Sequence, residues 1–233
     1  MVLIEKLDKW MIARAIKENT EYQKTALSPT DALQCPRKVY YRWHKFKASE
    51  PDARTCRVFT LGDSIHERWQ KIMEDMKIQL KSEYYIDTQY KGVPIHGYVD
   101  SICVIDRETY IVELKSQKDW MYGKKDYLME AKEEHIGQVM MYMHFTGIPK
   151  AIVMYENKND STLKEFHIDY NQTLALKILD DFVLLYTDIN LNQVPNKMKD
   201  ANIKKFPCSY CDYKEICFES EDELLPVESD ESL

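Results

Sequence analysis

The stretch Ile95–Gln117, IHGYVDSICVIDRETYIVELKSQ, decides the fold of the chain. Apolar and other residues alternate on both sides of a polar run at 106–109, which is the period-two pattern of β-strands. We therefore predict a hairpin whose return strand covers 110–116 and whose turn is the four-residue polar run. A charged residue inside either strand then requires an explanation.

Three charged residues interrupt these strands: Asp100 in the first, and Glu113 and Lys115 two positions apart on one side of the second. Depending on register, Asp100 lies opposite Glu113 or Lys115 once the hairpin folds. Carboxylate oxygens are the ligands that hard divalent cations prefer. The pattern predicts a divalent-metal site with a lysine beside it. The alternative is a buried salt bridge, which is costly when it serves no function.

The composition is that of an ordinary globular protein, with 233 residues of which 44% are hydrophobic, enough for one sizeable core. Seven acidic residues and no lysine or arginine lie in 219–233, and the other acidic residues balance the 32 basic ones. We expect 1–218 to form a single domain and 219–233 to be an acidic, disordered tail. No apolar run is long enough to span a bilayer and the first ten residues are too charged for a signal peptide, so we expect no membrane association and a cytoplasmic location.

The six cysteines fall into two groups. Thiols of a cytoplasmic chain are more often metal ligands or buried side chains than disulfide partners. One early cysteine and a late C-x2-C-x5-C run form the candidate ligand set: Cys35, Cys208, Cys211 and Cys217. The other two, Cys56 and Cys103, lie in apolar surroundings and are expected to be buried thiols. Four thiolates can hold either a structural zinc ion or an iron-sulphur cluster.

Helical and strand patterns follow one another along the rest of the chain. Helices are expected at 2–23, from 28 to 35, and at 59–78, 130–145 and 174–189, and strands at 83–90, 150–156 and 163–170 beside the hairpin. The first helix carries an apolar stripe, and we expect that stripe to pack on a later element. This order predicts an α/β (α+β) fold with a mixed central sheet flanked by helices.

Basic and aromatic side chains interleave in the run 37–47, RKVYYRWHKFK, which contains no acidic residue. Basic side chains neutralise phosphates and aromatic rings stack on bases, a combination that suits single-stranded nucleic acid. The candidate contacts are Arg37, Lys38, Tyr41, Arg42 and Trp43. The alternative is a helix with an aromatic core face and a solvated basic face.

Three other residues mean little alone. His66 lies beside the apolar stripe of the helix predicted at 59–78, where a histidine is more often a hydrogen-bonded core residue than a ligand. Gln138 and Tyr142 lie four residues apart and therefore share one face of the helix predicted at 130–145. The hairpin charges change the interpretation of all three.

Together these features resemble the PD-(D/E)XK nuclease superfamily, and in particular its RecB-like iron-sulphur branch, which includes the CRISPR-associated Cas four exonucleases and their phage and viral relatives. The motifs that carry the resemblance occur in the family's order: His66 in GDSIHE, Asp100 in HGYVD, Glu113 and Lys115 in ELKS, Gln138 and Tyr142 in GQVMMY, and the cysteines of CPRK and CSYCDYKEIC. They span 28–217. One departure is the hairpin turn, which lacks the glycine common there.

The resemblance implies a restriction-endonuclease-like sheet with an iron-sulphur-stapled helical region. Asp100 and Glu113 would bind Mn2+ or Mg2+, with His66 and the carbonyl of Leu114 completing the set of ligands. Lys115 would orient or deprotonate the attacking water, while Gln138 and Tyr142 would position the phosphate or support the lysine. The four cysteines would hold a 4Fe-4S cluster in preference to zinc.

The activity implied is metal-dependent hydrolysis of DNA, as an exonuclease on single strands or free ends with endonuclease activity as a further option. The sequence contains no G-x4-G-K-[ST] motif for an ATP-driven motor, so a helicase or CRISPR adaptation proteins are candidate partners. Two other classes stay open. One is a non-cutting nucleic-acid-binding adaptor of a CRISPR or recombination complex, and the other is a zinc-stabilised interaction module.

Overall fold

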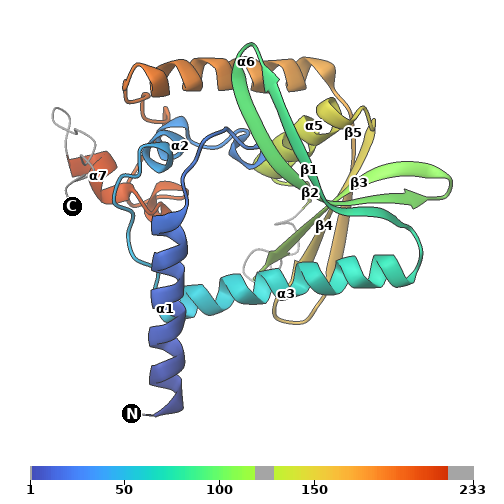
Figure 1. Cartoon of the computed structure of the whole chain (residues 1–233), viewed down its shortest axis with the longest axis horizontal. Coiled ribbons are helices and arrows are strands. Elements are labelled where there is room, and N and C mark those ends of the chain that lie inside the picture. The colour runs from blue at the N-terminus through green and yellow to red at the C-terminus, as the bar shows by residue number, and fades with distance from the viewer. Residues whose placement is uncertain (1, 119–128, 220–233) are drawn as a thin grey trace. The chain divides into compact units, whose positions relative to one another are not determined.

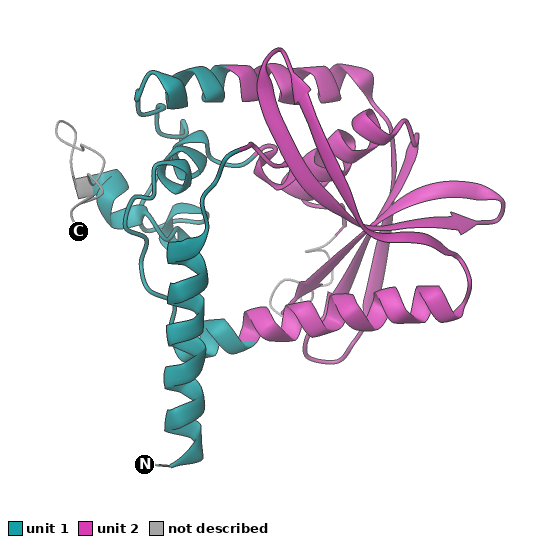
Figure 2. Ribbon diagram, viewed as in Figure 1, with its two compact units in different colours: residues 1–25, 34–57, 184–233 teal, residues 26–33, 58–183 magenta. Residues whose placement is uncertain are grey.

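The computed structural model of the protein describes residues 2–118 and 129–219 (Figure 1). The contacts divide the chain into two compact units (Figure 2). The sheet unit comprises residues 26–33 and 58–183, and the cysteine unit comprises residues 1–25, 34–57 and 184–233. Beyond its first residue, the tail predicted at 219–233 lies outside the described residues.

Within the described residues, the sheet unit contains one five-stranded sheet with the order β1-β2-β3-β4-β5. The strands are β1 (Gln79–Tyr90), β2 (Val93–Ile105), β3 (Glu108–Gln117), β4 (Lys150–Asn157) and β5 (Leu163–Asp169). β3 and β4 are parallel and every other neighbouring pair is antiparallel. The predicted mixed sheet flanked by helices is confirmed.

The turn between β2 and β3 is shorter than predicted. Only Asp106 and Arg107 lie between the strands, and their φ angles of 51° and 71° are those of a two-residue hairpin with both central residues left-handed. The expected four-residue turn is therefore wrong, because Glu108 and Thr109 already pair with β2.

Helices cover both faces of the sheet. On one face, Met73 of α3 (Ala53–Asp75) packs in a core cluster with residues of β2 and β3 that include Leu114. On the other face lies α5 (Glu133–Thr146), whose Gln138 hydrogen-bonds to Glu113, the strand neighbour of Leu114. Successive strand residues point to opposite faces, so β3 contributes to both layers. Gly147 ends α5 with a φ of 71°, a left-handed cap.

A short segment before α3 also belongs to the sheet unit. Leu27 is fully buried and forms a parallel bridge with Ile95 of β2. It leads into the 3-10 helix η1 (Pro29–Asp31), which Ser28 closes with a capping box. A Cβ on Gly97 would come within 2.7 Å of Pro29 Cδ, so this close approach of η1 to β2 requires glycine.

The other helices of the described residues are α6 (Gln172–Asn190) and, in the cysteine unit, α1 (Leu3–Glu21), α2 (Pro36–Trp43), η2 (Cys208–Tyr210) and α7 (Lys214–Glu219). The expectation that α1 packs its apolar stripe is wrong for this structure. None of its residues is buried, and Leu3, Leu7 and Trp10 are each at least half exposed.

In the described part of the chain, no helix combines the length and the apolar character needed to cross a membrane.

Candidate active site

The β2–β3 register settles which residue faces Asp100. The last paired residues before the strands separate are Ser101 and Val112, so the next positions in that register are Asp100 and Glu113. Asp100 Oδ2 accepts a 2.7 Å hydrogen bond from the backbone N–H of Leu114. The structure therefore holds the aspartate against the strand that carries the glutamate and the lysine.

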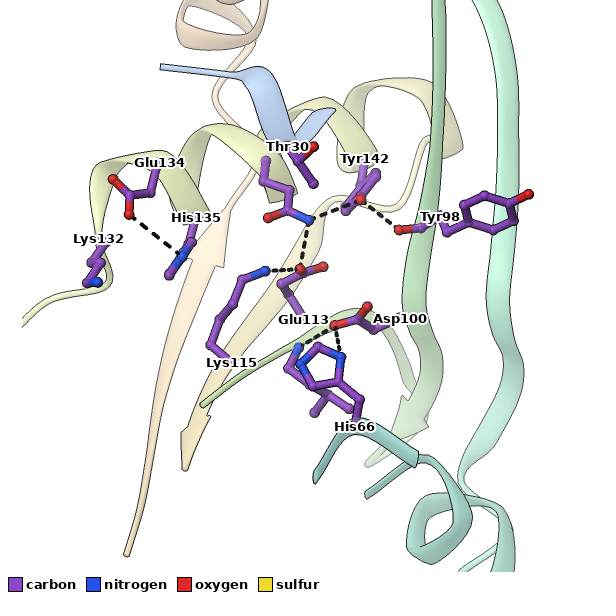
Figure 3. Close-up of polar contacts among 12 residues, drawn as sticks. Thr30, His66, Tyr98, Asp100, Glu113, Lys115, Lys132, Glu134, His135 and Tyr142 are labelled. Atoms are coloured by element: carbon purple, nitrogen blue, oxygen red, sulfur yellow. Dashed lines mark hydrogen bonds and ion pairs between the residues drawn. The ribbon is translucent and has the colours of Figure 1, made fainter. Parts of the chain in front are cut away.

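Glu113 lies at the centre of the group and is only 1% exposed (Figure 3). Its Oε1 accepts hydrogen bonds from Lys115 Nζ at 2.5 Å and from Gln138 Nε2 at 2.7 Å. Its Oε2 is buried and has no hydrogen-bond partner among the residues that the structure describes. One oxygen of this carboxylate is thus fixed by the protein and the other is left to interact with something else.

Gln138 and Tyr142 lie one turn apart on α5, as their spacing predicted. Gln138 Nε2 donates to the Tyr142 hydroxyl at 3.1 Å, and that hydroxyl donates to the carbonyl oxygen of Tyr98 at 2.6 Å. The chain of hydrogen bonds runs from β2 through α5 to Glu113. Both side chains therefore hold the glutamate in place.

His66 approaches from α3. Its Nδ1 lies 3.6 Å from Asp100 Oδ2, too far for a direct hydrogen bond but near enough for both to contact one small ion. Gln70, one turn further along α3, donates to the backbone carbonyl of Asp100 at 3.0 Å. The helix and strand are therefore in contact at this point.

Burial dominates the electrostatics of the group. It raises the pKa of Asp100, and burial together with the Asp100 charge raises the pKa of Glu113. Burial alone would lower the pKa of Lys115, but the charges of Glu113 and Asp100 outweigh it and the pKa is raised. Burial and then the Lys115 charge lower the pKa of His66, which favours the neutral imidazole.

The residues present fit a divalent cation. Two buried carboxylates raise each other's proton affinity when no cation lies between them, and the unpartnered Glu113 oxygen is a free ligand atom. No group of three or more His, Cys, Asp and Glu side chains within residues 2–118 and 129–219 is already arranged to hold a metal ion. Asp100, Glu113 and His66 would need a small adjustment to bind the same ion.

Sequence reasoning missed three residues that lie beside Lys115. Lys132 and His135 are drawn in Figure 3, and Tyr155 is the β4 residue that pairs with Lys115. The Tyr155 hydroxyl accepts the backbone N–H of Lys132 at 3.1 Å and lies 2.6 Å from His135 Nδ1. A usable signal was present, because His135 precedes Gln138 by three residues and so shares its helix face. Tyr155 gave none, since an aromatic residue in a β-strand is ordinary core.

The four candidate ligand cysteines all belong to the cysteine unit and carry free thiols. Burial raises the pKa of Cys211 and the nearby Cys35 adds to this shift, and the Arg37 guanidinium lies 3.9 Å from Cys217 Sγ. All four are partly exposed, whereas Cys56 and Cys103 are buried as predicted. The donor types therefore fit a metal or an iron-sulphur cluster.

The basic run of α2 divides between core and surface. Tyr41 is 1% exposed and packs against Phe46 and Tyr213, so the expectation that its ring stacks on a base is wrong. Arg37 Nε donates to the Pro195 carbonyl at 2.8 Å. A cleft of about 380 Å³ in the cysteine unit is lined by residues that include Arg42.

The other predicted contacts of that run, Lys38 and Trp43, are partly exposed. The Trp43 ring meets Tyr186 edge to face at 5.7 Å. Its remaining surface and the two basic side chains, Lys38 and Arg42, stay candidate contacts for nucleic acid.

Solved structures share this fold. The protein SSO0001 superposes with a TM-score of 0.60 at 18% sequence identity, covering 91% of this chain and 95% of its own. An alkaline exonuclease from Laribacter hongkongensis superposes with a TM-score of 0.53 at 12% identity, covering 76% of this chain and 93% of its own. No protein-family model matches the sequence, and no curated protein sequence is significantly similar to it.

Proposed function

We propose that the protein is a metal-dependent deoxyribonuclease of the PD-(D/E)XK type that hydrolyses phosphodiester bonds at single strands or DNA ends. The observation that carries the proposal is the buried Glu113. One of its oxygens accepts hydrogen bonds from both Lys115 and Gln138. The other, beside Asp100, has no partner among the described residues. A purely structural ion pair would satisfy both oxygens, because a buried polar atom without a partner is costly.

Asp100, Glu113 and His66 would hold Mg2+ or Mn2+, together with the carbonyl of Leu114, which follows Glu113 in β3. Such an ion, when bound, polarises the phosphoryl group and activates water. The protein's own part is positioning: Gln138 and Tyr142 fix the side chain of Glu113, and the Leu114 amide fixes that of Asp100.

Lys115 contributes charge at the reacting centre. Its ammonium group already donates a hydrogen bond to Glu113 Oε1, so it is placed to donate to a phosphate oxygen or to the attacking water. Hydrolysis adds the water oxygen to phosphorus and breaks the bond to the leaving sugar oxygen. Lys115 stabilises the negative charge that develops in this exchange.

We assign a 4Fe-4S cluster to four cysteines, the three of the C-x2-C-x5-C run and Cys35, which directly precedes α2. The guanidinium of Arg37 beside Cys217 suits the negative charge of four thiolates around iron. Free thiols at all six cysteines agree with a reducing compartment, and we propose the cytoplasm. DNA would be the substrate. The candidate protein partners are a helicase, which would separate the strands, or CRISPR adaptation proteins.

One experiment separates this proposal from a non-cutting adaptor. End-labelled single- and double-stranded DNA is incubated with the purified protein and Mn2+ or Mg2+, beside Lys115→Ala and the control Lys150→Ala. Lys150 pairs with Glu108 at 2.6 Å on the surface. Cutting by the wild type and the control but not by Lys115→Ala supports the nuclease, whereas binding without cutting by all three refutes it.

A further inference from the structure

The start of α5 places two more nitrogen donors beside Lys115 than the reaction proposed above uses. Figure 3 shows the side chains of Lys132 and His135 on the same side of the sheet as Lys115. Both are partly exposed, with the His135 side chain at 16%. Substrate can therefore reach them, although the protein surrounds most of their surface.

The His135 ring is held in one orientation and one protonation state. The Tyr155 hydroxyl oxygen accepts the Lys132 N–H at 3.1 Å and lies 2.6 Å from His135 Nδ1. We assign the single proton of this hydroxyl to the bond with Nδ1, which gives both groups a partner. Nδ1 is then an acceptor, so the proton of a neutral ring must be on Nε2. His135 thus presents an N–H donor, which suits an oxyanion and not a cation.

The charges around the ring keep it neutral. Burial, followed by the charges of Lys115 and Lys132, lowers the pKa of His135 to about 2. Burial also lowers the pKa of Lys132; the Glu134 charge opposes this shift and the Lys115 charge adds to it. Lys115 has Glu113 as its partner within the protein, so Lys132 and the His135 N–H add a second positive charge and a neutral donor beside that pair. Both kinds of group bind phosphate oxygens.

We propose that Lys132 and His135 form a phosphate-binding subsite beside Lys115, which holds the DNA phosphate next to the one that is cleaved. The subsite rests on the proposed nuclease function. Lys132 supplies charge and His135 supplies a neutral, oriented donor. Tyr155 is a positioning residue that acts through the imidazole.

Glu134 limits the affinity of this subsite. Its Oε1 lies 3.9 Å from His135 Nε2, beyond hydrogen-bond distance, and its side chain is 43% exposed. Its charge opposes that of an incoming phosphate. Removing Glu134 should therefore strengthen DNA binding, whereas losing Lys132 should weaken it. The test thus includes one substitution that is expected to raise the affinity.

The test measures binding of a fluorescent single-stranded oligonucleotide to the full chain, without divalent ions, over a series of KCl concentrations. Lys132→Gln and His135→Ala should each weaken binding about tenfold, as expected for a lost hydrogen bond to a charged group. Lys132→Gln should also reduce the slope of log K against log salt by about 0.7, the value for one contact to a single strand. His135→Ala removes no charge and should leave the slope unchanged.

Three further substitutions complete the test, and the first of them separates a positioning role of His135 from a role in folding. His135→Gln keeps an N–H donor near the position of Nε2 and should recover most of the affinity, whereas a structural role would give no such rescue. Glu134→Gln should tighten binding. Lys150→Gln removes one surface lysine of the same unit and should have little effect.

The subsite would be overturned, and the nuclease function would stand, under one set of results. These are cleavage by the wild type, an unchanged salt slope for Lys132→Gln and an unchanged affinity for His135→Ala. Equal losses in His135→Ala and His135→Gln would overturn the donor role of the ring. If the wild type neither binds nor cuts DNA, the nuclease and the subsite both fail.

Discussion

In the sheet unit, Asp100, Glu113 and Lys115 are held by main-chain and side-chain hydrogen bonds between strands and α5. In the cysteine unit, Cys208 begins a short 3-10 helix and Cys211 directly follows it. The thiols of both residues are partly exposed. A catalytic group must be in place before its substrate arrives, so a regular scaffold suits it. A metal or cluster can itself organise the loops that bind it.

The largest effect should come from the cysteine unit. Cys208→Ser removes one ligand of the proposed cluster, and the binding free energy of a structural metal, on the order of 10 kcal/mol, is also folding free energy. We expect loss of iron and of brown colour, with rapid proteolysis of residues 34–57 and 184–218 while the sheet stays folded. Cys56→Ser, a buried cysteine outside the set, is the control. A colourless wild type that contains zinc would reject the cluster.

The next effect concerns the chemical step. Lys115→Ala should reduce DNA cleavage about a thousandfold, because one positioned charge or proton donor contributes on the order of 10²–10⁴ in rate. Circular dichroism should show an intact fold, and urea unfolding should show a loss of stability of about 1–3 kcal/mol, because the buried Glu113 loses its charged partner. Residual cleavage within tenfold of wild type would mean that Lys115 is only a structural partner of Glu113.

Gln138→Ala tests whether the network pre-positions Glu113. The substitution removes the amide donor to Glu113 Oε1, so a buried carboxylate loses one of its two partners. We expect stability to fall by about 1–3 kcal/mol in urea unfolding and cleavage to fall about tenfold. The exposed Gln89→Ala should change neither quantity. Unchanged cleavage would show that Lys115 and the backbone suffice to position Glu113 without Gln138.

The smallest effect is a pH dependence of stability. His135 has a pKa of about 2 in the folded protein and an ordinary value of 6.5 when unfolded, so the unfolded chain binds more protons between these values. Stability is therefore complete above pH 6.5 and is lost as the pH falls. Between pH 7 and pH 5, His135→Gln should lose about 2 kcal/mol less than wild type. Parallel curves for the two proteins would contradict the buried, neutral ring.

The hairpin and its charged residues were predictable because they depend on period-two alternation over a short stretch of chain. Its register was not, since it depends on a turn in which Asp106 and Arg107 both adopt positive φ, a conformation that non-glycine residues seldom adopt. With the turn shortened to two residues, Asp100 faces Glu113, one of the two alternatives that the sequence left open.

Residues that meet through long-range contacts were harder to predict. Tyr155 reaches Lys132 and His135 only because β4 pairs in parallel with β3, where Lys115 is its partner. The apolar stripe of α1 led to a different error. The helix that its period predicts is present, but none of its residues is buried in the described structure. Periodicity identifies a face of a helix and does not say what covers it.

The bridge between Leu27 and Ile95 means that the sheet unit is assembled from two separate pieces of chain. His96 N–H donates to the Leu27 carbonyl at 2.9 Å, and Leu27 N–H donates to the Pro94 carbonyl at 3.0 Å. A shortened chain that begins at Val58 would leave this stretch of β2 without its partner segment. The short segment 26–33 could then be supplied as a peptide, which makes this fold a starting point for a split protein whose assembly is controlled from outside.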